Sequence, residues 1–252
     1  MRILLLRHGM PDYTTDSLTP QGHVEARLLA KRLQNYHIRD IYTSPLGRAR
    51  QTAEYTLRLR NQQADVLPWL AEFRGRCPDP VTGQDRIPWD FPPRLWTSQP
   101  QLLDPEKWVE APLVAEGTVK QILEETKEGV SELLARYGFQ RQGPVWLSEH
   151  NTRDTIALFC HFGISAAVLA VLLGCSPVSL WQHSLSVTSS LTEVITEERI
   201  PGEVVFRVIR FGDISHLESA GVARSTAGLY PECYTGVDST DPRNNLELPW
   251  VL

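Results

Sequence analysis

The 252-residue sequence lacks several features that mark large classes of protein. It has no block of basic residues and a formal net charge of −5, which argues against a nucleic-acid partner. No apolar stretch reaches the roughly 18 residues of a membrane span. The four-residue apolar run between Arg2 and Arg7 is too short for a signal peptide. We therefore expect a cytoplasmic protein with neither a membrane nor a nucleic-acid partner.

Sequence patterns typical of disulfides, metal sites and nucleotide sites are also missing. The four cysteines have no paired spacing, so we expect reduced thiols. The seven histidines are scattered, without a His-Glu-x-x-His motif, and the glycines form neither a Walker loop nor a strand-anchored Gly-x-Gly-x-x-Gly. We therefore expect no metal and no cofactor. The cysteines are Cys77, Cys160, Cys175 and Cys233, and the histidines are His8, His23, His37, His150, His161, His183 and His216.

Two histidines stand where an apolar run ends. Residues 3–6 have the pattern of a buried strand, which stops abruptly at Arg7-His8-Gly9, a combination of little use for packing. Residues 155–160 form a similar strand, followed by His161-Phe162-Gly163 and a helix, 164–173, that is apolar on all sides. The second histidine would thus lie between a strand end and a helix N-terminus, whose free N–H groups attract anions.

A third segment points to the same site. Residues 44–53 follow a short strand pattern and open a helix that carries Arg48. In open α/β sheets ligands bind beyond the carboxyl ends of the strands, and arginine suits phosphate because its planar fork donates two parallel hydrogen bonds. The sequence therefore predicts a phosphate site in which Arg7, Arg48 and His161 surround His8.

The alternation of strand and helix patterns predicts an α/β fold, a three-layer α/β/α sandwich with a mostly parallel central sheet. Thr19-Pro20 is a typical helix start, and an apolar stripe over 119–134 predicts a helix ended by Gly138. Residues 190–196 and 204–211 are typical of late strands.

Four motifs stand in a fixed order along the chain. They are Arg7-His8-Gly9, Leu18-Thr19-Pro20-Gln21-Gly22, the run Ser-Pro-Leu-x-Arg-Ala-x-Gln-Thr-Ala at 44–53, and His161-Phe162-Gly163. This set resembles the histidine phosphatase superfamily, also called the phosphoglycerate mutase-like family. The resemblance spans most of the chain, and it implies the corresponding fold and a covalent mechanism without a metal.

Carried over residue by residue, the resemblance implies that His8 is the nucleophile that becomes a phosphohistidine. Arg7, Arg48 and His161 would bind the transferred group. The two arginines should also disfavour the protonated form of the nucleophile. The resemblance places the proton donor at Glu72, which needs a raised pKa for that role.

The proton donor has rivals in the sequence. Glu72-Phe73-Arg74-Gly75 matches the family's setting for this acid, but Glu110 and Glu116 also lie where a loop could bring them in.

The chain departs from the mutase pattern. Met10-Pro11-Asp12-Tyr13 stands where mutases usually carry an acidic residue and then an asparagine that contacts phosphate. The residues around Glu72 lack the additional substrate-binding residues of mutases. Hydrolysis is therefore expected over mutase activity. Phe162, where many relatives have glycine, places a bulky ring beside the site and should alter the pocket's shape and not its chemistry.

One segment is unusual in composition. Residues 75–115 hold eight of the 18 prolines together with four large aromatic residues, Trp89, Phe91, Trp96 and Trp108. We interpret it as an insertion that forms a lid, with Trp89 and Trp96 binding an apolar or flat leaving group. The alternative, that the aromatics only pin the loop to the sheet, stays open.

The motifs at 8, 48, 72 and 161 must meet, so we expect one domain over residues 1–223 and a C-terminal extension over 224–252. The last residues, 248–252, are apolar enough to dock, and a homo-oligomer in which they bind a neighbouring subunit is an open option. The predicted activity is hydrolysis of a phosphate monoester, with a small phosphorylated metabolite as substrate. The alternatives are a phosphoglycerate-type phosphomutase and a non-catalytic sensor of phosphate or phosphoprotein.

Overall fold

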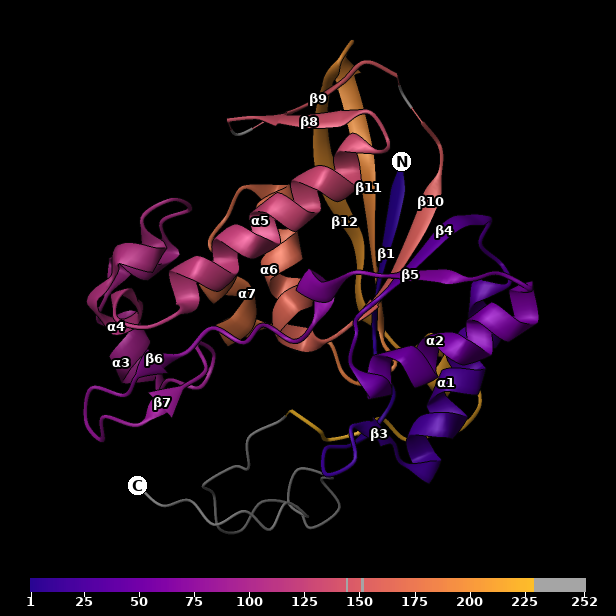
Figure 1. Ribbon diagram of the computed structural model, residues 1–252, viewed down its shortest axis with the longest axis horizontal. Coiled ribbons are helices and arrows are strands. Elements are labelled where there is room, and N and C mark those ends of the chain that lie inside the picture. The colour runs from indigo at the N-terminus through magenta and orange to yellow at the C-terminus, as the bar shows by residue number, and fades with distance from the viewer. Residues whose placement is uncertain (144, 151, 229–252) are drawn as a thin grey trace.

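The computed structural model describes residues 1–143, 145–150 and 152–228. Its main feature is an eight-stranded sheet (Figure 1). The strands are β1 (Arg2–Arg7), β4 (Ile38–Thr43), β5 (Ala64–Val66), β8 (Phe139–Gln142), β9 (Val145–Ser148), β10 (Thr155–Cys160), β11 (Leu191–Ile200) and β12 (Glu203–Asp213). They are ordered β5-β4-β10-β1-β11-β12-β9-β8 across the sheet.

Helices cover both faces of this sheet. On one face, α1 (Pro20–Leu33) packs against α2 (Gly47–Arg60), which contacts β4 and β10. On the other, α5 (Val119–Ala135) and α7 (Pro177–His183) pack against α6 (Phe162–Leu173), which contacts β1 and β12 (Figure 1). The short α8 (Ser215–Glu218) lies on α1. The predicted three-layer α/β/α sandwich is confirmed.

Strand direction divides the sheet into two halves. The pairs β5–β4, β4–β10 and β10–β1 are parallel, and these strands carry the predicted motifs. The pairs from β11 to β8 and the β1–β11 pair are antiparallel. A tight turn joins β11 to β12, because Ile200 pairs with Glu203, and Gly202 supplies the positive φ of 83° that such turns favour. The sheet is therefore mixed, with its parallel half at the predicted site.

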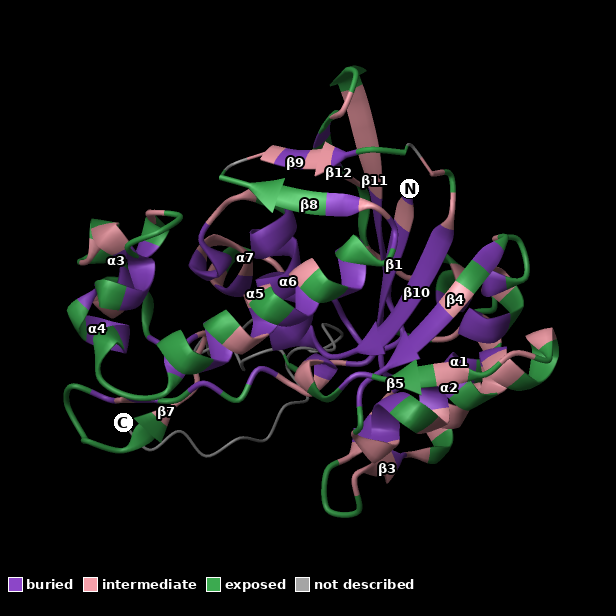
Figure 2. Cartoon of the chain, turned by 45° about the horizontal axis from the view of Figure 1, so that its top comes forward, coloured by how far each residue is buried: buried purple, intermediate pink, exposed green. Residues whose placement is uncertain are grey.

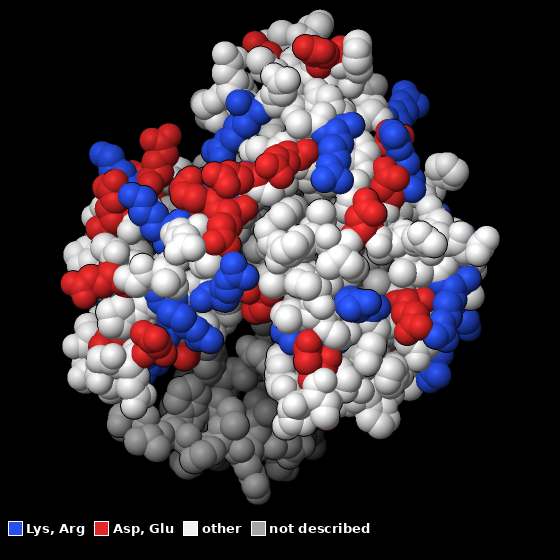
Figure 3. All heavy atoms as spheres, viewed as in Figure 1, with Lys and Arg blue, Asp and Glu red and all other residues white. Residues whose placement is uncertain are grey.

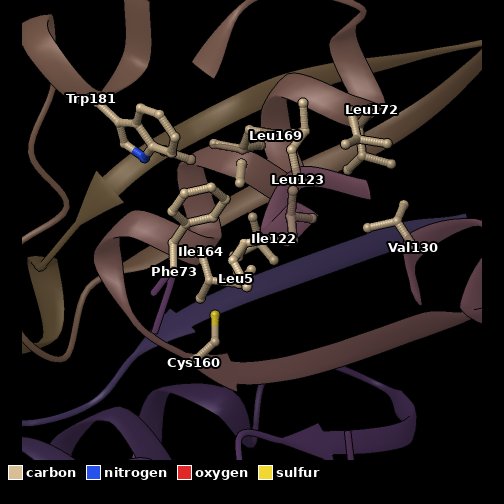
Figure 4. Close-up of a cluster of buried hydrophobic side chains, with 14 of the residues drawn as sticks. Leu5, Phe73, Ile122, Leu123, Val130, Cys160, Ile164, Leu169, Leu172 and Trp181 are labelled. Atoms are coloured by element: carbon tan, nitrogen blue, oxygen red, sulfur yellow. The ribbon is translucent and has the colours of Figure 1, made fainter. Parts of the chain in front are cut away.

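The central strands are buried on both faces, which explains their unbroken apolar runs (Figure 2). Leu4 and Leu6 of β1 belong to one core cluster with residues of α1. Ile3 and Leu5 belong to a larger cluster that includes residues of α5 and α6. Figure 4 shows part of the larger cluster, with Leu5 of β1 near Ile164 of α6.

The predicted helix boundaries are borne out by local chemistry. Thr19 caps α1, since its Oγ1 accepts a hydrogen bond from Gly22 N at 3.1 Å, and Pro20 occupies the first turn. The chain leaves α5 through Gly138, whose φ of 82° lies in the left-handed region. The expected late strands are β11 and β12.

The proline-rich segment, residues 75–115, forms a lobe beside α5 and α7 (Figure 1). It contains β6 (Cys77–Pro78), β7 (Asp85–Arg86), α3 (Pro93–Thr97), α4 (Pro112–Ala115) and two 3-10 turns at Pro100–Leu103 and Trp108–Glu110. Phe91, Trp96 and Trp108 are buried in the larger core cluster, so these three aromatics pin the segment to the domain. That the segment acts as a lid stays a prediction.

Three further expectations concern single features. Cys77, Cys160 and Cys175 are free, as expected, and Cys233 lies outside the described residues. The extension beyond residue 228, including the apolar residues 248–252, also lies outside them. In the part of the chain that the structure describes, no helix combines the length and apolar character that a membrane crossing needs.

Candidate active site

The parallel strands end at the same edge of the sheet. Arg7 pairs with Cys160 at the ends of β1 and β10, and Phe159 pairs with Thr43 at the ends of β10 and β4. The next residues continue this alignment, because His8 N donates to Cys160 O at 3.0 Å and the N–H of Ser44 donates to Phe159 O at 2.8 Å. The register thus brings His8, His161 and Ser44 together, and the first two were predicted to meet.

The His8 ring has a defined tautomer. Its Nδ1 lies 2.7 Å from the carbonyl oxygen of Gly9, which can only accept, so Nδ1 carries the hydrogen and Nε2 the free electron pair. The side chain is 1% exposed. Burial, and then the charges of Arg7 and Arg48, hold the pKa of His8 well below its usual value. The imidazole is therefore neutral with an unprotonated Nε2, which is the form of a nucleophile.

His161 lies against His8, with ring centroids 5.0 Å apart. Burial, followed by the charges of its neighbours, keeps the pKa of His161 well below its ordinary value. Its Nε2 is 2.7 Å from the Ser44 hydroxyl, whose oxygen accepts from Leu46 N at 3.1 Å and whose hydrogen can be donated to Nε2, which leaves the ring hydrogen on Nδ1. Nδ1 is buried and has no hydrogen-bond partner among the described residues. A buried, unpaired ring nitrogen beside His8 is suited to bind an oxygen atom of a ligand.

The two predicted arginines are held differently. Arg7 donates from Nη1 to Ser186 O at 2.7 Å, and its guanidinium carbon lies 5.9 Å from the centre of the Phe162 ring. Arg48 donates from Nη1 to Oδ1 of Asp16 at 2.5 Å. Within the described chain, Nε of each arginine has no partner. Both guanidiniums line the same pocket and keep N–H groups free for an anion.

Glu72 reaches the site from the loop after the 3-10 turn at Pro68–Leu70. Its Oε1 accepts hydrogen bonds from Phe73 N at 2.8 Å and from Ile164 N, in the first turn of α6, at 3.0 Å. Burial raises the pKa of this carboxyl, and these N–H groups and Arg7 oppose the rise. The net upward direction is the one that a proton donor needs.

Two glycines explain why the first two motifs occur together. A Cβ on Gly9 would lie 2.6 Å from Gly22 O, and one on Gly22 would lie 2.2 Å from Met10 O. The strand end therefore touches the first turn of α1 directly, and neither position has room for a side chain. Gly9 N is satisfied by Thr52 Oγ1 of α2 at 3.0 Å, which links the third motif to the first.

A pocket of about 630 Å³ opens over the two arginines. It is lined by Arg7, Tyr13, Leu46, Arg48, Ala71, Glu72, Phe73, Arg74, Arg76, Ile87, Trp89, Phe162 and Gly228. The structure therefore brings Arg7, Arg48, Glu72, Trp89 and Phe162 of the predicted residues to one space, with His8 and His161 buried beside it.

The remaining predicted residues lie elsewhere. Trp96 is buried against His183, with ring centroids 5.2 Å apart, and is outside this pocket. The expectation that Trp96 lines a leaving-group pocket is therefore wrong, because α3 turns its ring into the core. Glu110 and Glu116 are exposed and also outside the pocket, so Glu72 is the carboxylate that the structure places there.

Some residues of the site were not predicted. Asp16 binds Arg48, Ser44 contacts His161, and Thr52 accepts from Gly9 N. Tyr13 lies in the pocket wall, with its ring centre 5.3 Å from the Arg48 guanidinium carbon. Ser44 and Thr52 stand inside the quoted motif at 44–53, so the motif itself was the signal. Asp16 and Tyr13 have no comparable local pattern.

Two curated relatives each match a part of this chain. An uncharacterized protein from Picosynechococcus sp. is 44% identical over 87 residues, which are 31% of this chain and 50% of that protein. A protein described as a probable phosphoglycerate mutase, from Photorhabdus laumondii, is 34% identical over 82 residues, which are 29% of this chain and 38% of that protein. The chain thus matches half or less of the length of these relatives.

Solved structures share the fold over most of the chain. A phosphoserine phosphatase from Entamoeba histolytica is 19% identical, with a TM-score of 0.56, covering 86% of this chain and 98% of its own. A mycobacterial glucosyl-3-phosphoglycerate phosphatase is 22% identical, with a TM-score of 0.54, covering 83% and 98%. The model of the histidine phosphatase superfamily (branch 1) matches residues 3–206. The chain, whose strand-end histidines and arginines form the site described above, therefore belongs to the histidine phosphatase superfamily.

Proposed function

We propose that this protein hydrolyses a small phosphate monoester through a phosphohistidine on His8. The observation that carries the proposal is a neutral His8 with an unprotonated Nε2, buried beside two arginines and a carboxyl of raised pKa. Family membership supports a phosphatase or a mutase reaction at a coarse level. The residue roles below are the finer part of the proposal.

In the first step, His8 Nε2 attacks the phosphorus and forms the N–P bond as the ester P–O bond breaks. The bond's electron pair leaves with the ester oxygen, which takes the proton of Glu72, so a neutral alcohol departs. Arg7, Arg48 and the Nδ1–H of neutral His161 would bind the phosphoryl oxygens, where the two arginine charges and this N–H stabilise the transition state without reorganisation.

In the second step, water attacks the phosphohistidine. The Glu72 carboxylate takes a proton from that water, a new P–O bond forms, and the N–P bond breaks. Inorganic phosphate and neutral His8 result, and Glu72 is again protonated. The same carboxyl acts as acid and then as base, as microscopic reversibility requires. No redox partner is needed.

The pocket's charges also point to a substrate class. Arg74 and Arg76 line it together with Arg7 and Arg48, and the remaining wall is largely apolar. Arg74 pairs with Glu125 at 2.7 Å, whereas Arg76 forms no ion pair within the described residues. Figure 3 shows basic side chains at the edge of a hollow low on this face. We infer a leaving group that carries a second negative charge, such as a carboxylate. Structural neighbours have been solved with phosphoserine and with 3-phosphoglyceric acid bound.

The experiment measures phosphate release, without added metal, from a panel of carboxylated phosphate esters, sugar phosphates, nucleotides and p-nitrophenyl phosphate. Wild type and His8→Ala are compared, with His37→Ala as a control at a histidine outside the site. Hydrolysis that His8→Ala abolishes, together with acid-labile phosphate on wild type after rapid quenching, supports the proposal. Equal hydrolysis by His8→Ala overturns it.

The match to a probable phosphoglycerate mutase keeps a phosphomutase as second candidate. A mutase would retain the phosphoryl group on His8 for long periods and return it to a second position of the substrate. Stable labelling by a bisphosphate, with positional transfer and little release of phosphate, would favour it over the phosphatase. If neither labelling nor turnover is detected, the non-catalytic sensor is favoured.

A further inference from the structure

Trp89 lies in the segment 75–115 and extends from it to the N-terminus of α6. Its ring meets that of Phe162 edge to face, with centroids 6.0 Å apart and an interplanar angle of 89°. It also packs against Trp181 of α7, with centroids 5.5 Å apart. Trp89 is therefore the one large aromatic of this segment that lines the pocket, since Trp96 and Trp108 are not among its described lining residues.

Gly163 is the point at which Trp89 and Glu72 meet. A Cβ at this position would lie 2.3 Å from Cη2 of Trp89 and 2.8 Å from Oε1 of Glu72. The indole edge and the carboxyl oxygen thus both lie against Gly163, where any other residue would carry a Cβ. Gly163 lies in the regular helix α6 and has no positive φ, so its backbone conformation does not require glycine. Glycine is needed because a Cβ would clash with its neighbours.

The same turn is fixed from a second side. Trp181 donates from Nε1 to Gly163 O at 2.9 Å, and its ring packs on Phe73 with centroids 4.9 Å apart. Figure 4 shows Phe73 beside Trp181 and near Ile164. Because Phe73 follows Glu72 directly, this packing fixes the backbone that carries the carboxyl, and the Trp89 indole lies on the other side of Gly163 beside the carboxyl oxygen.

We propose that Trp89 is a positioning residue for the reaction: it holds the Glu72 carboxyl against the first turn of α6 and excludes water from it. This inference rests on the proposed function, in which Glu72 donates the proton. It assigns to the proline-rich segment a direct effect on catalysis in addition to any contact with the leaving group.

The charges around Glu72 decide the direction of the effect. Glu72 lines the pocket together with Arg7 of β1, Arg48 of α2, Arg74 and Arg76, and it lies near Glu125 of α5 and the buried neutral Cys160. The buried neutral His8 and His161 adjoin Arg7 and Phe162 of the same pocket. The cations favour the carboxylate, so the acid form depends on exclusion of water. Removing the indole admits water, and Glu72 then loses its proton at a lower pH.

The test compares wild type with Trp89→Ala, Trp89→Phe and Leu103→Ala, a control at an exposed apolar residue of the same segment outside the pocket. The readout is kcat/KM against pH for a serine-type alkyl phosphate and for p-nitrophenyl phosphate, whose leaving group needs little help from an acid. For Trp89→Ala with the alkyl ester, we expect the alkaline limb of the kcat/KM profile to move down by about one pH unit. At pH values above this limb, kcat/KM is then about tenfold lower than in wild type. We expect Trp89→Phe to keep most of the wild-type profile, and Leu103→Ala to leave the profile in place.

Gly163→Ala provides an independent route, because its methyl group displaces the same indole and carboxyl without removing either. We expect it to shift the alkaline limb in the same direction. The inference is overturned if Trp89→Ala and Gly163→Ala lower kcat/KM equally for both esters and leave the alkaline limb in place. Trp89 would then be a binding residue. The proposed function fails separately, if wild type itself shows no turnover that depends on His8.

Discussion

Asp16 fixes the position of Arg48. Its Oδ1 accepts from the Arg48 guanidinium at 2.5 Å, and its Oδ2 accepts from Gly47 N at 2.6 Å, at the start of α2. The contact extends to the backbone, since a Cβ on Gly47 would lie 2.2 Å from Asp16 O. Asp16 itself has a φ of 50°, which non-glycine residues rarely adopt. The loop that follows His8 thus sets the geometry of an arginine 32 residues further along the chain.

Replacing Asp16 with alanine should therefore misplace Arg48. We expect kcat/KM for a phosphate ester to fall roughly tenfold, because a charged hydrogen bond that orients the guanidinium is lost. Asp16→Asn keeps one acceptor and should lose less. Glu54→Ala is the matched control, since Glu54 pairs with Arg58 on the exposed side of the same helix. Unchanged kinetics in Asp16→Ala would contradict the positioning role.

Glu72→Gln should separate substrates by their leaving groups. A glutamine cannot donate a proton of comparable acidity, so we expect kcat/KM for an alkyl phosphate to fall by roughly 10²- to 10⁴-fold. For p-nitrophenyl phosphate the loss should be much smaller, since its leaving group departs as a stable anion. Steady-state kinetics on both esters measure this. Equal losses on the two would remove Glu72 from the donor role.

The same substitution should change stability with pH. Burial raises the pKa of Glu72, so the folded state binds its proton more tightly than the unfolded chain. Stability from this group is thus present below the ordinary carboxyl pKa of about 4.3 and is lost as pH rises through the folded value. Glutamine still accepts the N–H groups of Phe73 and Ile164. We expect Glu72→Gln to melt above wild type at pH 8 and this gain to shrink toward pH 4.

Thermal unfolding at several pH values tests this, with Glu124→Gln as an exposed control in an ion pair with Lys127. A gain in melting temperature that is the same at pH 4 and pH 8 would mean that the carboxyl's charge is not the cause.

Arg76→Gln should affect only substrates that carry a second negative charge. Arg76 is exposed, so we expect a modest rise in KM, roughly two- to fivefold, for a carboxylated phosphate ester. KM for p-nitrophenyl phosphate should stay unchanged. Arg94→Gln is the control, because Arg94 is an exposed arginine of the same segment outside the pocket. Equal effects on both substrates would contradict the proposed substrate class.

The sequence by itself determined the local elements and the order of the motifs. The apolar runs before His8 and His161 predict β1 and β10, because strands buried on both faces have no polar alternation. Thr19-Pro20 predicts the start of α1, because a cap and a fixed φ act within one turn. That Arg7, Arg48 and His161 gather near His8 was also predictable, since the carboxyl ends of parallel neighbouring strands share one edge.

The tertiary structure decided what depends on contacts between distant segments. No local pattern indicates that Asp16 orients Arg48, that Trp89 meets Glu72 at Gly163, or that Trp96 turns into the core, because these outcomes follow from packing and not from periodicity. The sequence predicted a mostly parallel sheet and did not indicate its antiparallel half, since a strand's apolar pattern does not encode its direction. The local sequence thus indicated which histidines and arginines gather at the candidate site, and packing decided how they are held.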